Sequence, residues 1–192
     1  EKEGLKSEII VVINNSNDDT LGVVKSFSEK YKNIRYIDLE PGGKGFATIM
    51  GFKEALNDSK SEVIGFVDAD MSTLPEDFYD LYKNMGDYSG IIASRWKKGA
   101  KVERSKGKWI RSRGFNFLVR SLFLFPYEDT QCGAKLFRKE AIESFVNHIE
   151  IPEWAFDVNI LYLCKQKGFR IKEHPTIWED KEGSAIDFIN VP

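Results

Sequence analysis

The chain has few cysteines, few histidines and no long apolar run, and each shortage narrows what it can be. Among its 192 residues there are only two cysteines and two histidines. Cys132 and Cys164 lack the close spacing of a metal-binding motif, so we expect free thiols in a reducing compartment. The longest apolar candidate, residues 115–126, is too short to cross a bilayer and contains polar residues. No secretory signal is visible.

The chain also lacks a strong charge of either sign, so composition gives no general case for nucleic-acid binding. Lysine and arginine total 28, aspartate and glutamate total 30, and the net charge is −2. Basic residues nevertheless gather in one segment, where Glu103 is the single acid. The segment contains Arg95, Lys97, Lys98, Lys101, Arg104, Lys106, Lys108, Arg111, Arg113 and Arg120. Such a local field attracts phosphates or an anionic surface, and a solvated surface loop is the alternative.

Apolar strand-like segments alternate with amphipathic helix-like segments along most of the chain. We predict strands at 8–13, 34–39, 62–67, 90–94, 134–137 and 170–174. We predict helices at 19–31, 74–85, 109–125 and 155–167, with others opening after Gly45 and at Lys139. This alternation indicates an α/β fold, a mostly parallel sheet with helices on both faces. The length fits one domain spanning residues 1–192.

The strand predicted at 62–67 ends in two aspartates, Asp68 and Asp70. In an extended segment, residues two apart point the same way, so both carboxylates can face one ligand. Carboxylate oxygens suit Mg²⁺ or Mn²⁺ held jointly with the phosphates of a substrate. Open α/β sheets bind ligands at the carboxyl ends of their strands, which favours this interpretation over a solvated loop or a helix cap.

The residues after the two aspartates predict the start of a helix. Thr73 is the expected N-cap, Glu76 would reach back to it, and Pro75 would lie in the first turn. Asp68 and Asp70 would then lie on a short loop between a core strand and a helix, which is a rigid place to hold a metal ion.

Eight motifs resemble, in order, those of one enzyme family. They are Ile10-Val11-Val12-Ile13-Asn14-Asn15-Ser16-Asn17-Asp18, Gly43-Lys44-Gly45, Asp68-Ala69-Asp70-Met71-Ser72-Thr73, Ala93-Ser94-Arg95-Trp96, Ser112-Arg113-Gly114-Phe115-Asn116, Asp129-Thr130-Gln131-Cys132-Gly133-Ala134-Lys135-Leu136-Phe137, Trp154-Ala155-Phe156-Asp157, and Trp178 followed by Lys181-Glu182-Gly183-Ser184. The chain thereby resembles the family 2 glycosyltransferases of GT-A (Rossmann-like) fold. Within that family it looks most like the polyprenyl-phosphate glycosyltransferases, which include dolichyl-phosphate glucose and mannose synthases.

The resemblance implies a metal-assisted, inverting hexosyltransferase. Such an enzyme moves glucose or mannose from a nucleotide-sugar, UDP-glucose or GDP-mannose, to a polyprenyl phosphate such as dolichyl or undecaprenyl phosphate. The acceptor is already an anion and needs no strong general base, so the main burden is charge on the departing diphosphate. Mg²⁺ or Mn²⁺ would neutralise that charge. The resemblance also implies a peripheral or anchored position on the cytoplasmic face of a membrane.

The resemblance assigns roles to individual residues. Those expected to be catalytic are Asp70, Asp129, Arg95 and Arg113. Those expected to bind the nucleotide, the sugar or the acceptor phosphate are Asn14, Lys44, Asp68, Gln131, Arg111 and Lys181. Asp68 and Asp70 are the expected metal ligands, and arginine offers the bidentate geometry that suits an acceptor phosphate. Two alternatives stay open: Asp129 and Gln131 could make only structural hydrogen bonds, and Asp157 could be only a helix cap.

The helix predicted at 109–125 is basic and unusually apolar. The apolar residues expected on one face are Phe115, Leu118, Val119, Leu122 and Phe125, and they alternate with Arg111, Arg113 and Arg120. A basic amphipathic helix of this kind can lie in a lipid headgroup layer. An ordinary core helix with a polar edge is the alternative.

The chain departs from the family pattern at two places. Family members begin with a strand that this sequence lacks, so we expect a fragment whose sheet has an exposed edge or a gap. Where the family has Asp-Asp-Gly-Ser, this chain reads Asn14-Asn15-Ser16 after Ile13. Asparagine both donates and accepts hydrogen bonds, so the choice between uridine and guanosine stays open.

Two other functions remain possible from the sequence. A non-catalytic nucleotide-sugar-binding module would explain the missing strand and the missing base-reading aspartate. A sugar-1-phosphate nucleotidylyltransferase would share a parallel sheet, a glycine loop and metal-binding aspartates. In that class the glycine-rich loop should follow the first strand, whereas here Gly42–Gly45 follows a later one.

Overall fold

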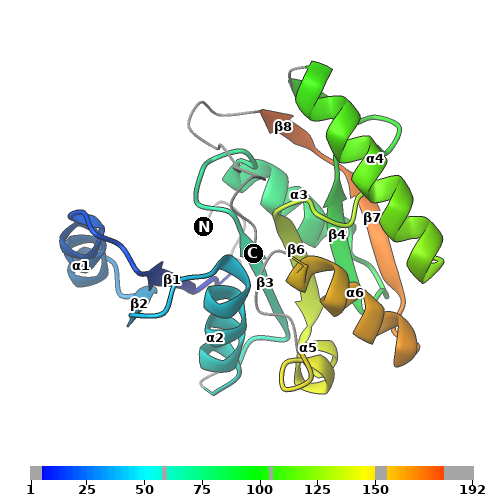
Figure 1. The fold of residues 1–192 in the computed structure, drawn as a ribbon. Coiled ribbons are helices and arrows are strands. Elements are labelled where there is room, and N and C mark those ends of the chain that lie inside the picture. Colours follow the sequence, from blue (N-terminus) through cyan, green and yellow to red (C-terminus); the bar gives the residue numbers. More distant parts are fainter. Residues whose placement is uncertain (1–5, 58–59, 104–105, 150–154, 180–192) are drawn as a thin grey trace.

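The computed structural model describes residues 6–57, 60–103, 106–149 and 155–179 (Figure 1). Its central sheet has the strand order β3-β6-β4-β7. These strands are β3 (Val63–Val67), β6 (Ala134–Arg138), β4 (Gly90–Ser94) and β7 (Ile171–Pro175). Two further sheets have two strands each. One pairs β1 (Ile9–Asn14) with β2 (Ile34–Leu39), and the other pairs β5 (Lys101–Glu103) with β8 (Ile177–Glu179).

Strand β6 runs against its neighbours, while the other pairs are parallel. β1 with β2, β4 with β7, and β5 with β8 are parallel, whereas β6 is antiparallel to both β3 and β4. The reason lies at the entrance to β6, where the amide of Asp68 donates to the carbonyl of Gly133 at 2.9 Å. The chain thus enters β6 beside the carboxyl end of β3 and must run back along it. The α/β fold is confirmed, and the reversed β6 makes the central sheet mixed, since two of its three strand pairings are antiparallel.

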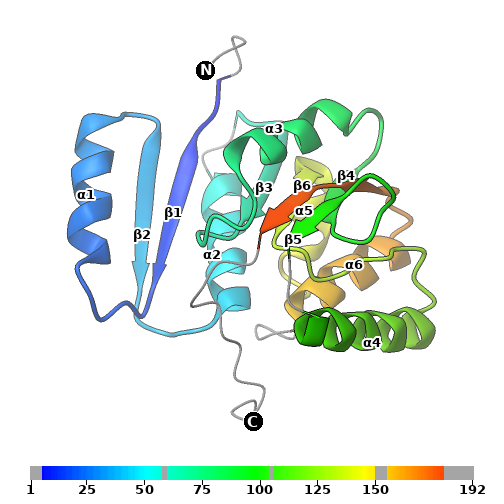
Figure 2. The ribbon, with the colours of Figure 1, turned by 90° about the horizontal axis from the view of Figure 1, so that it is seen from above.

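Helices cover both faces of the central sheet, as the alternation of segments predicts. They are α1 (Thr20–Lys30), α2 (Lys44–Asn57), α3 (Pro75–Asn84), α4 (Lys106–Phe123), α5 (Lys139–Phe145) and α6 (Phe156–Gln166). Seen from above, α3 lies on one side of the sheet, and α2, α5 and α6 lie on the other (Figure 2). β5 and β8 are the strands that the sequence did not predict; each is only three residues long.

The alternation of side chains along the strands creates two cores. On β4, Ile91 belongs to the smaller core beneath α3, and its neighbour Ile92 belongs to the larger core beneath α2, α5 and α6. β6 alternates in the same way, with Leu136 facing α3 and Phe137 facing the larger core. Successive residues of a strand point to opposite faces, so two covered faces require a continuous apolar run.

The start of α3 differs from the predicted capping box. Its N-cap is Leu74 rather than Thr73, no side chain caps the first turn, and Thr73 is buried. Pro75 does occupy the first helical turn, as predicted. A residue that precedes proline is pushed into extended conformation, so the helix cannot begin before Pro75 and Leu74 takes the capping position.

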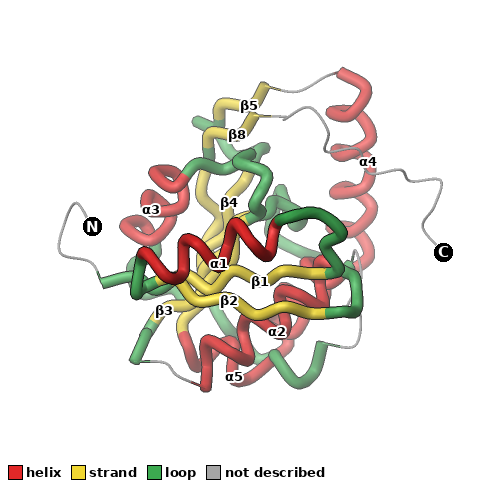
Figure 3. The backbone as a smooth tube through the Cα atoms, turned by 90° about the vertical axis from the view of Figure 1, so that its left-hand side faces the viewer, coloured by secondary structure: helices red, strands yellow, loops and turns green. Residues whose placement is uncertain are grey.

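The β1–β2 pair stands apart from the central sheet, with α1 packed along it (Figure 3). Within the described residues, no strand pairs with the edges of β1 and β3 that face each other. Helix α2 connects the two parts because it packs on both β1 and β3. A Cβ atom on Gly51 of α2 would lie 3.1 Å from a methyl carbon of Val12. That the chain is a fragment lacking a strand stays a prediction.

Phe52 is the side chain through which α2 is anchored in the larger core. It is 2% exposed, and its ring lies 6.0, 6.3 and 6.0 Å from the rings of Phe66, Phe137 and Phe145. Truncating a buried phenylalanine removes transfer energy and leaves a cavity, so Phe52→Ala should lower the free energy of unfolding by about 3–5 kcal/mol. Urea unfolding followed by circular dichroism measures it. Phe27→Ala on α1, where the ring is 49% exposed, is the matched control, and equal losses would contradict the assignment.

Candidate active site at the carboxyl edge of the sheet

Three of the predicted site residues lie where strands end. Asn14 ends β1, Lys44 begins α2 just after β2, and Asp68 directly follows β3. The ammonium of Lys44 lies 2.7 Å from Oδ1 and 2.8 Å from Oδ2 of Asp68. This ion pair joins the loop after β2 to the end of β3, although the two strands belong to different sheets.

The carboxylate of Asp68 rests on the backbone of Gly133. A Cβ atom at Gly133 would lie 1.9 Å from Oδ2 of Asp68, so any larger residue would push that carboxylate away. Asp70 turns the same loop, because its Oδ1 accepts a hydrogen bond from the amide of Ser72 at 2.9 Å. Met71, which lies between Asp70 and Ser72, has φ of 60°, in the left-handed conformation. Asp70 remains exposed, so both carboxylates lie on one rigid turn after β3.

The charges around Lys44 keep it cationic. Burial by itself lowers the pKa of this ammonium, but the carboxylates of Asp68 and Asp157 outweigh that effect and leave the pKa above its ordinary value. The ring of Phe156 also lies 5.9 Å from the ammonium. The edge of the sheet therefore already holds one cation against the carboxylate of Asp68.

Arg95 and Asp129, both predicted to be catalytic, form a buried bidentate ion pair with each other. Nε and a terminal nitrogen of Arg95 donate to the two oxygens of Asp129 at 2.7 and 2.8 Å, and the Arg95 amide donates at 3.0 Å. The amide of Gln131 adds a fourth bond at 3.2 Å. Burial by itself raises the pKa of Asp129, but the charge and hydrogen bonds of Arg95 outweigh that effect. The pKa therefore lies below its ordinary value, and the carboxyl stays ionised. Both oxygens of Asp129 thus have partners within the protein.

The loop that carries Asp129 is held from two more sides. Glu173 on β7 accepts hydrogen bonds from the amides of Glu128 at 2.9 Å and Asp129 at 2.7 Å. Asn116 on α4 accepts from the amide and the hydroxyl of Thr130 at 3.1 and 3.0 Å. Sequence reasoning assigned no role to Glu173 or Asn116, and only the fold brings them to this loop. Together they fix the entrance to β6.

A second buried ion pair, Lys135 with Asp157, was missed by sequence reasoning. The ammonium of Lys135 contacts a carboxylate oxygen of Asp157 and donates to the carbonyl of Cys132 at 2.8 Å. Lys135 is completely buried, and a lysine inside the apolar strand 134–137 was the signal that could have revealed the pair. Asp157 lies in the first turn of α6 without capping it. The pair holds the loop before β6 against α6.

Two arginines alternate with three tryptophans between the site and α4. The guanidinium of Arg95 lies 5.4 Å from the ring centre of Trp178 and 5.8 Å from that of Trp96. Arg113 of α4 lies 5.1 Å from Trp96 and 5.5 Å from Trp109. Guanidinium groups within about 6 Å of an aromatic ring are attracted by its electrons. These contacts place Arg113, which is exposed, on the same side as the Asp129 loop.

Helix α4 exposes much of its apolar surface. Val119 and Phe125 of the predicted apolar face are buried, whereas Phe115, Leu118 and Leu122 are exposed. The predicted face is therefore split between the core and the surface. The most exposed apolar side chains at this end are Phe117 (74%), Leu122 (69%) and Leu124 (78%). Within the described ranges, no helix combines the length and apolarity that a membrane span requires.

Three of the residues named from the sequence cannot be placed fully. Lys181 and Trp154 lie outside the described residues, and Arg111 lies in α4 but its side chain is not described.

Asn14 can be placed, and its Oδ1 is buried with no hydrogen-bond partner among the described residues. That oxygen is therefore an available acceptor at the end of β1.

The two predicted metal ligands fit a shared rather than a self-sufficient metal site. Among the described residues, no group of three or more histidine, cysteine or acidic side chains could hold a metal ion by itself. Mg²⁺ usually keeps several waters and is held by one or two carboxylates together with substrate phosphates. Asp68 and Asp70 supply such a donor set, and the ammonium on Asp68 shows that a cation fits there.

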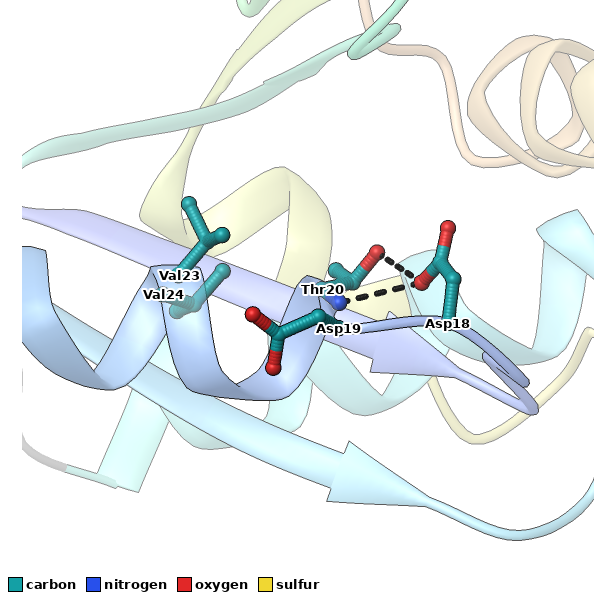
Figure 4. A pocket seen from close by; sticks show the side chains of 5 residues that line it. All are labelled: Asp18, Asp19, Thr20, Val23 and Val24. Atoms are coloured by element: carbon teal, nitrogen blue, oxygen red, sulfur yellow. Dashed lines mark hydrogen bonds between the residues drawn. The ribbon is translucent and has the colours of Figure 1, made fainter.

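The two thiols and one further hollow of the described residues have no assigned role in this site. Cys132 and Cys164 are free and buried, and burial raises the pKa of each thiol to about 12, so neither is a ready nucleophile. A hollow of about 320 Å³ lies at the start of α1, where Asp18 accepts hydrogen bonds from the amide and hydroxyl of Thr20 (Figure 4). These bonds lower the pKa of Asp18.

Comparison with known proteins gives one family. Residues 1–146 match the family described as Glycosyl transferase family 2. The human dolichyl-phosphate beta-glucosyltransferase is 34% identical over 191 residues, which cover 93% of this chain and 58% of that protein. Glycosyltransferase AglD of Haloferax volcanii is 28% identical over 185 residues, which cover 95% of this chain and 29% of that protein. The chain thus spans little more than half of the human relative.

A solved structure shares the fold. Glucosyl-3-phosphoglycerate synthase from Mycobacterium tuberculosis, in complex with Mn²⁺, UDP-glucose and glycerol 3-phosphate, superposes with a TM-score of 0.69. The match covers 97% of this chain and 65% of that one, at 16% sequence identity. At that identity the likeness concerns the fold alone, and it agrees with the α/β architecture seen here.

Removing the negative charge of Asp129 should show how much its buried ion pair with Arg95 stabilises the folded protein. Asp129→Asn should lower the free energy of unfolding at pH 7 by about 3–5 kcal/mol, because Arg95 would stay buried without a counter-ion. The folded-state pKa of Asp129 lies below its ordinary value. This stabilisation is therefore present above the unfolded-state pKa of about 3.9 and is lost as the pH falls through the folded-state pKa.

Urea unfolding between pH 8 and pH 2 measures this. The difference between wild type and Asp129→Asn should be nearly constant down to about pH 4 and shrink below it, because the folded-state pKa of Asp129 lies under its ordinary value. Glu128→Gln is the control, since Glu128 pairs with Lys97 at 3.4 Å near the surface and should cost less than about 1 kcal/mol. A difference that stays constant to pH 2 would argue against an ionised Asp129.

Proposed function

Because the chain belongs to glycosyl transferase family 2, we propose that it transfers glucose from UDP-glucose to a polyprenyl phosphate, with inversion at the anomeric carbon. The observation that carries the proposal is the turn after β3, where Asp68 pairs with the cationic Lys44 and Asp70 follows two residues later. An enzyme that releases a nucleoside diphosphate needs such a site, because negative charge grows on the departing group.

The donor side of the proposed site comprises Asn14, Lys44, Asp68 and Asp70. The unpartnered Oδ1 of Asn14 can accept a hydrogen bond from a base, and Lys44 can contact the diphosphate. Glucose is favoured over mannose by the names of the relatives, and uridine is favoured over guanosine by the ligand of the solved structure. The human and Dictyostelium discoideum relatives are dolichyl-phosphate beta-glucosyltransferases, and the solved structure contains UDP-glucose.

In the proposed reaction an oxygen of the acceptor phosphate attacks the anomeric carbon of glucose from the face opposite the diphosphate. The bond from that carbon to the diphosphate oxygen breaks, and its electron pair leaves with UDP. No proton has to be removed from the acceptor, so no general base is required. Mg²⁺ or Mn²⁺, held by Asp68 and Asp70, would supply positive charge against the leaving diphosphate. Lys44 would orient that diphosphate.

The acceptor side of the proposed site is built on Arg113. Its guanidinium is exposed and lies between Trp96 and Trp109, so its direction is restrained while its donors can reach a phosphate. Arg95 and Asp129 are already paired with each other, and we propose that they support the site rather than contact the substrate. Gln131, in the same loop, would lie near the donor sugar.

We further propose that the exposed apolar side of α4 contacts the membrane that holds the lipid acceptor. Phe117, Leu122 and Leu124 would enter the headgroup boundary, and Arg113 and Arg120 would meet anionic lipids. The protein would then act as a peripheral enzyme, and its two free cysteines fit the reducing cytoplasmic side. A binding module without activity, or a nucleotidylyltransferase, gains no support from the relatives' names.

The activity is tested with the protein, UDP-glucose and a short-chain polyprenyl phosphate in detergent. Transfer should require Mg²⁺ or Mn²⁺ and stop with chelator. Asp70→Asn should lower kcat/KM by about 10²-fold or more, because a lost metal contact is worth several kcal/mol. Asp87→Asn, which changes an exposed carboxylate beyond α3, should leave transfer unchanged. Transfer that is equally fast with chelator would overturn the metal-assisted mechanism.

The membrane contact is tested by sedimentation with liposomes that contain anionic lipid. Replacing Phe117 and Leu122 with glutamate should abolish binding, because charged groups would have to enter the headgroup boundary. Replacing Val23 and Phe27 of α1, which are about half exposed, with glutamate is the matched control and should leave binding unchanged. Transfer to the detergent-soluble acceptor should survive in both variants. Equal binding of the two double variants would remove α4 from the membrane contact.

A further inference from the structure

We propose that Lys44 occupies the cation position at Asp68 when no ligand is bound, and that a divalent cation displaces it toward the donor diphosphate. This inference rests on the proposed function, since it assigns two successive partners to one side chain of that site. Lys44 would act as a tethered cation that keeps Asp68 neutralised between turnovers. It would then become a ligand of the nucleotide once the metal ion has taken its place.

The geometry sets the two occupants in competition. The Lys44 ammonium lies within hydrogen-bonding distance of both oxygens of Asp68, at 2.7 and 2.8 Å. A divalent ion bound to either oxygen would lie about 2.0–2.2 Å from it. The two cations would then be held within about 5 Å of each other on a single carboxylate, where their repulsion is strong. That repulsion favours movement of Lys44 when a divalent ion binds.

The carboxylate is the rigid partner and the lysine is the mobile one. Gly133 supports Asp68 so closely that even a Cβ atom there would collide with it, and the Asp68 amide is bonded to the Gly133 carbonyl. Lys44 has a flexible four-carbon side chain at the first residue of α2, and it is partly exposed. It can therefore leave Asp68 by rotating its side chain, without unfolding any backbone.

A phosphate group has a natural place close to the released lysine. Lys44 begins α2, so the amides of the first turn and the helix dipole favour an anion there. Gly43, immediately before Lys44, has φ of 123°, a conformation that favours glycine. Because glycine has no side chain, the approach of a phosphate to the start of α2 is not obstructed there. The ammonium is a compact donor that suits a phosphate from several directions. The metal ion on Asp68 and the ammonium of Lys44 would then both neutralise the negative charge of the diphosphate.

The exchange is tested with Mn²⁺ alone, by electron paramagnetic resonance titration of the protein without nucleotide. Lys44→Met should bind Mn²⁺ about fivefold more tightly than wild type, because the competing cation is gone. Lys44→Arg should bind it more weakly, since the guanidinium fork fits a carboxylate in a bidentate manner. Lys53→Met is the matched control. It removes the same charge from an exposed position of α2 and should not change Mn²⁺ affinity.

The proposed contact between the released Lys44 and the diphosphate is tested by calorimetry of UDP binding at saturating Mn²⁺. Lys44→Met should bind UDP about tenfold or more weakly, while Lys53→Met should match wild type. Mn²⁺ affinity that is unchanged or lower in Lys44→Met, or UDP affinity that is unchanged, would overturn the exchange. Mn²⁺ binding needs no sugar transfer. An inactive protein that shows the exchange would refute only the proposed function, and an active one that does not would refute only the exchange.

Discussion

The edge of the sheet depends on one buried ion pair, that of Asp129 with Arg95. A carboxylate without contact to water is tolerated only when it is paired and its oxygens accept hydrogen bonds. Asp129 meets both conditions through the fork and the amide of Arg95 and the amide of Gln131. The pair fixes the chain before β6 to the end of β4. Because Gly133 lies in that chain, it also fixes the surface on which Asp68 rests.

Burial separates the structural charges of this edge from those available for chemistry. Arg95 with Asp129, and Lys135 with Asp157, are pairs in the interior, where breaking one partner from the other is costly. Lys44 with Asp68 is a pair that remains partly exposed, and Asp70 is exposed. A ligand can reach only the exposed charges. The inner pairs therefore set the geometry of the turn after β3, and the outer charges can exchange partners.

Helix α4 belongs to the core and to the surface at once. Asn116 and Val119 face inward, and Asn116 carries two hydrogen bonds of Thr130. Phe117 and Leu122 face outward, as Arg113 does. The same helix thus connects an exposed apolar surface to the loop of Asp129. Contact at that surface and the position of Arg113 beside Trp96 are consequently linked through one rigid element.

Much of the architecture could be predicted from the sequence, because strands and helices leave a local pattern. The alternation of apolar runs with amphipathic segments located nearly every long element, and the motifs identified the family. The two aspartates after β3 and Lys44 after β2 could be named for the same reason, since functional side chains follow strand ends. Local pattern does not report pairing. The reversed direction of β6 and the short strands β5 and β8 depend on contacts between distant segments.

The tertiary structure alone decided which charged residues are partners. From the sequence, Arg95 and Asp129 were both expected at the substrate, yet 34 positions apart they satisfy each other. Lys135 and Asp157 were not recognised as a pair, because a lysine in a strand and an aspartate at the start of a helix carry no mutual signal. Whether a charge can contact a ligand directly depends on the partners that folding gives it. That outcome depends on which strand ends the fold brings together, so the sequence determined the elements and the candidate residues, and the packing determined their partners.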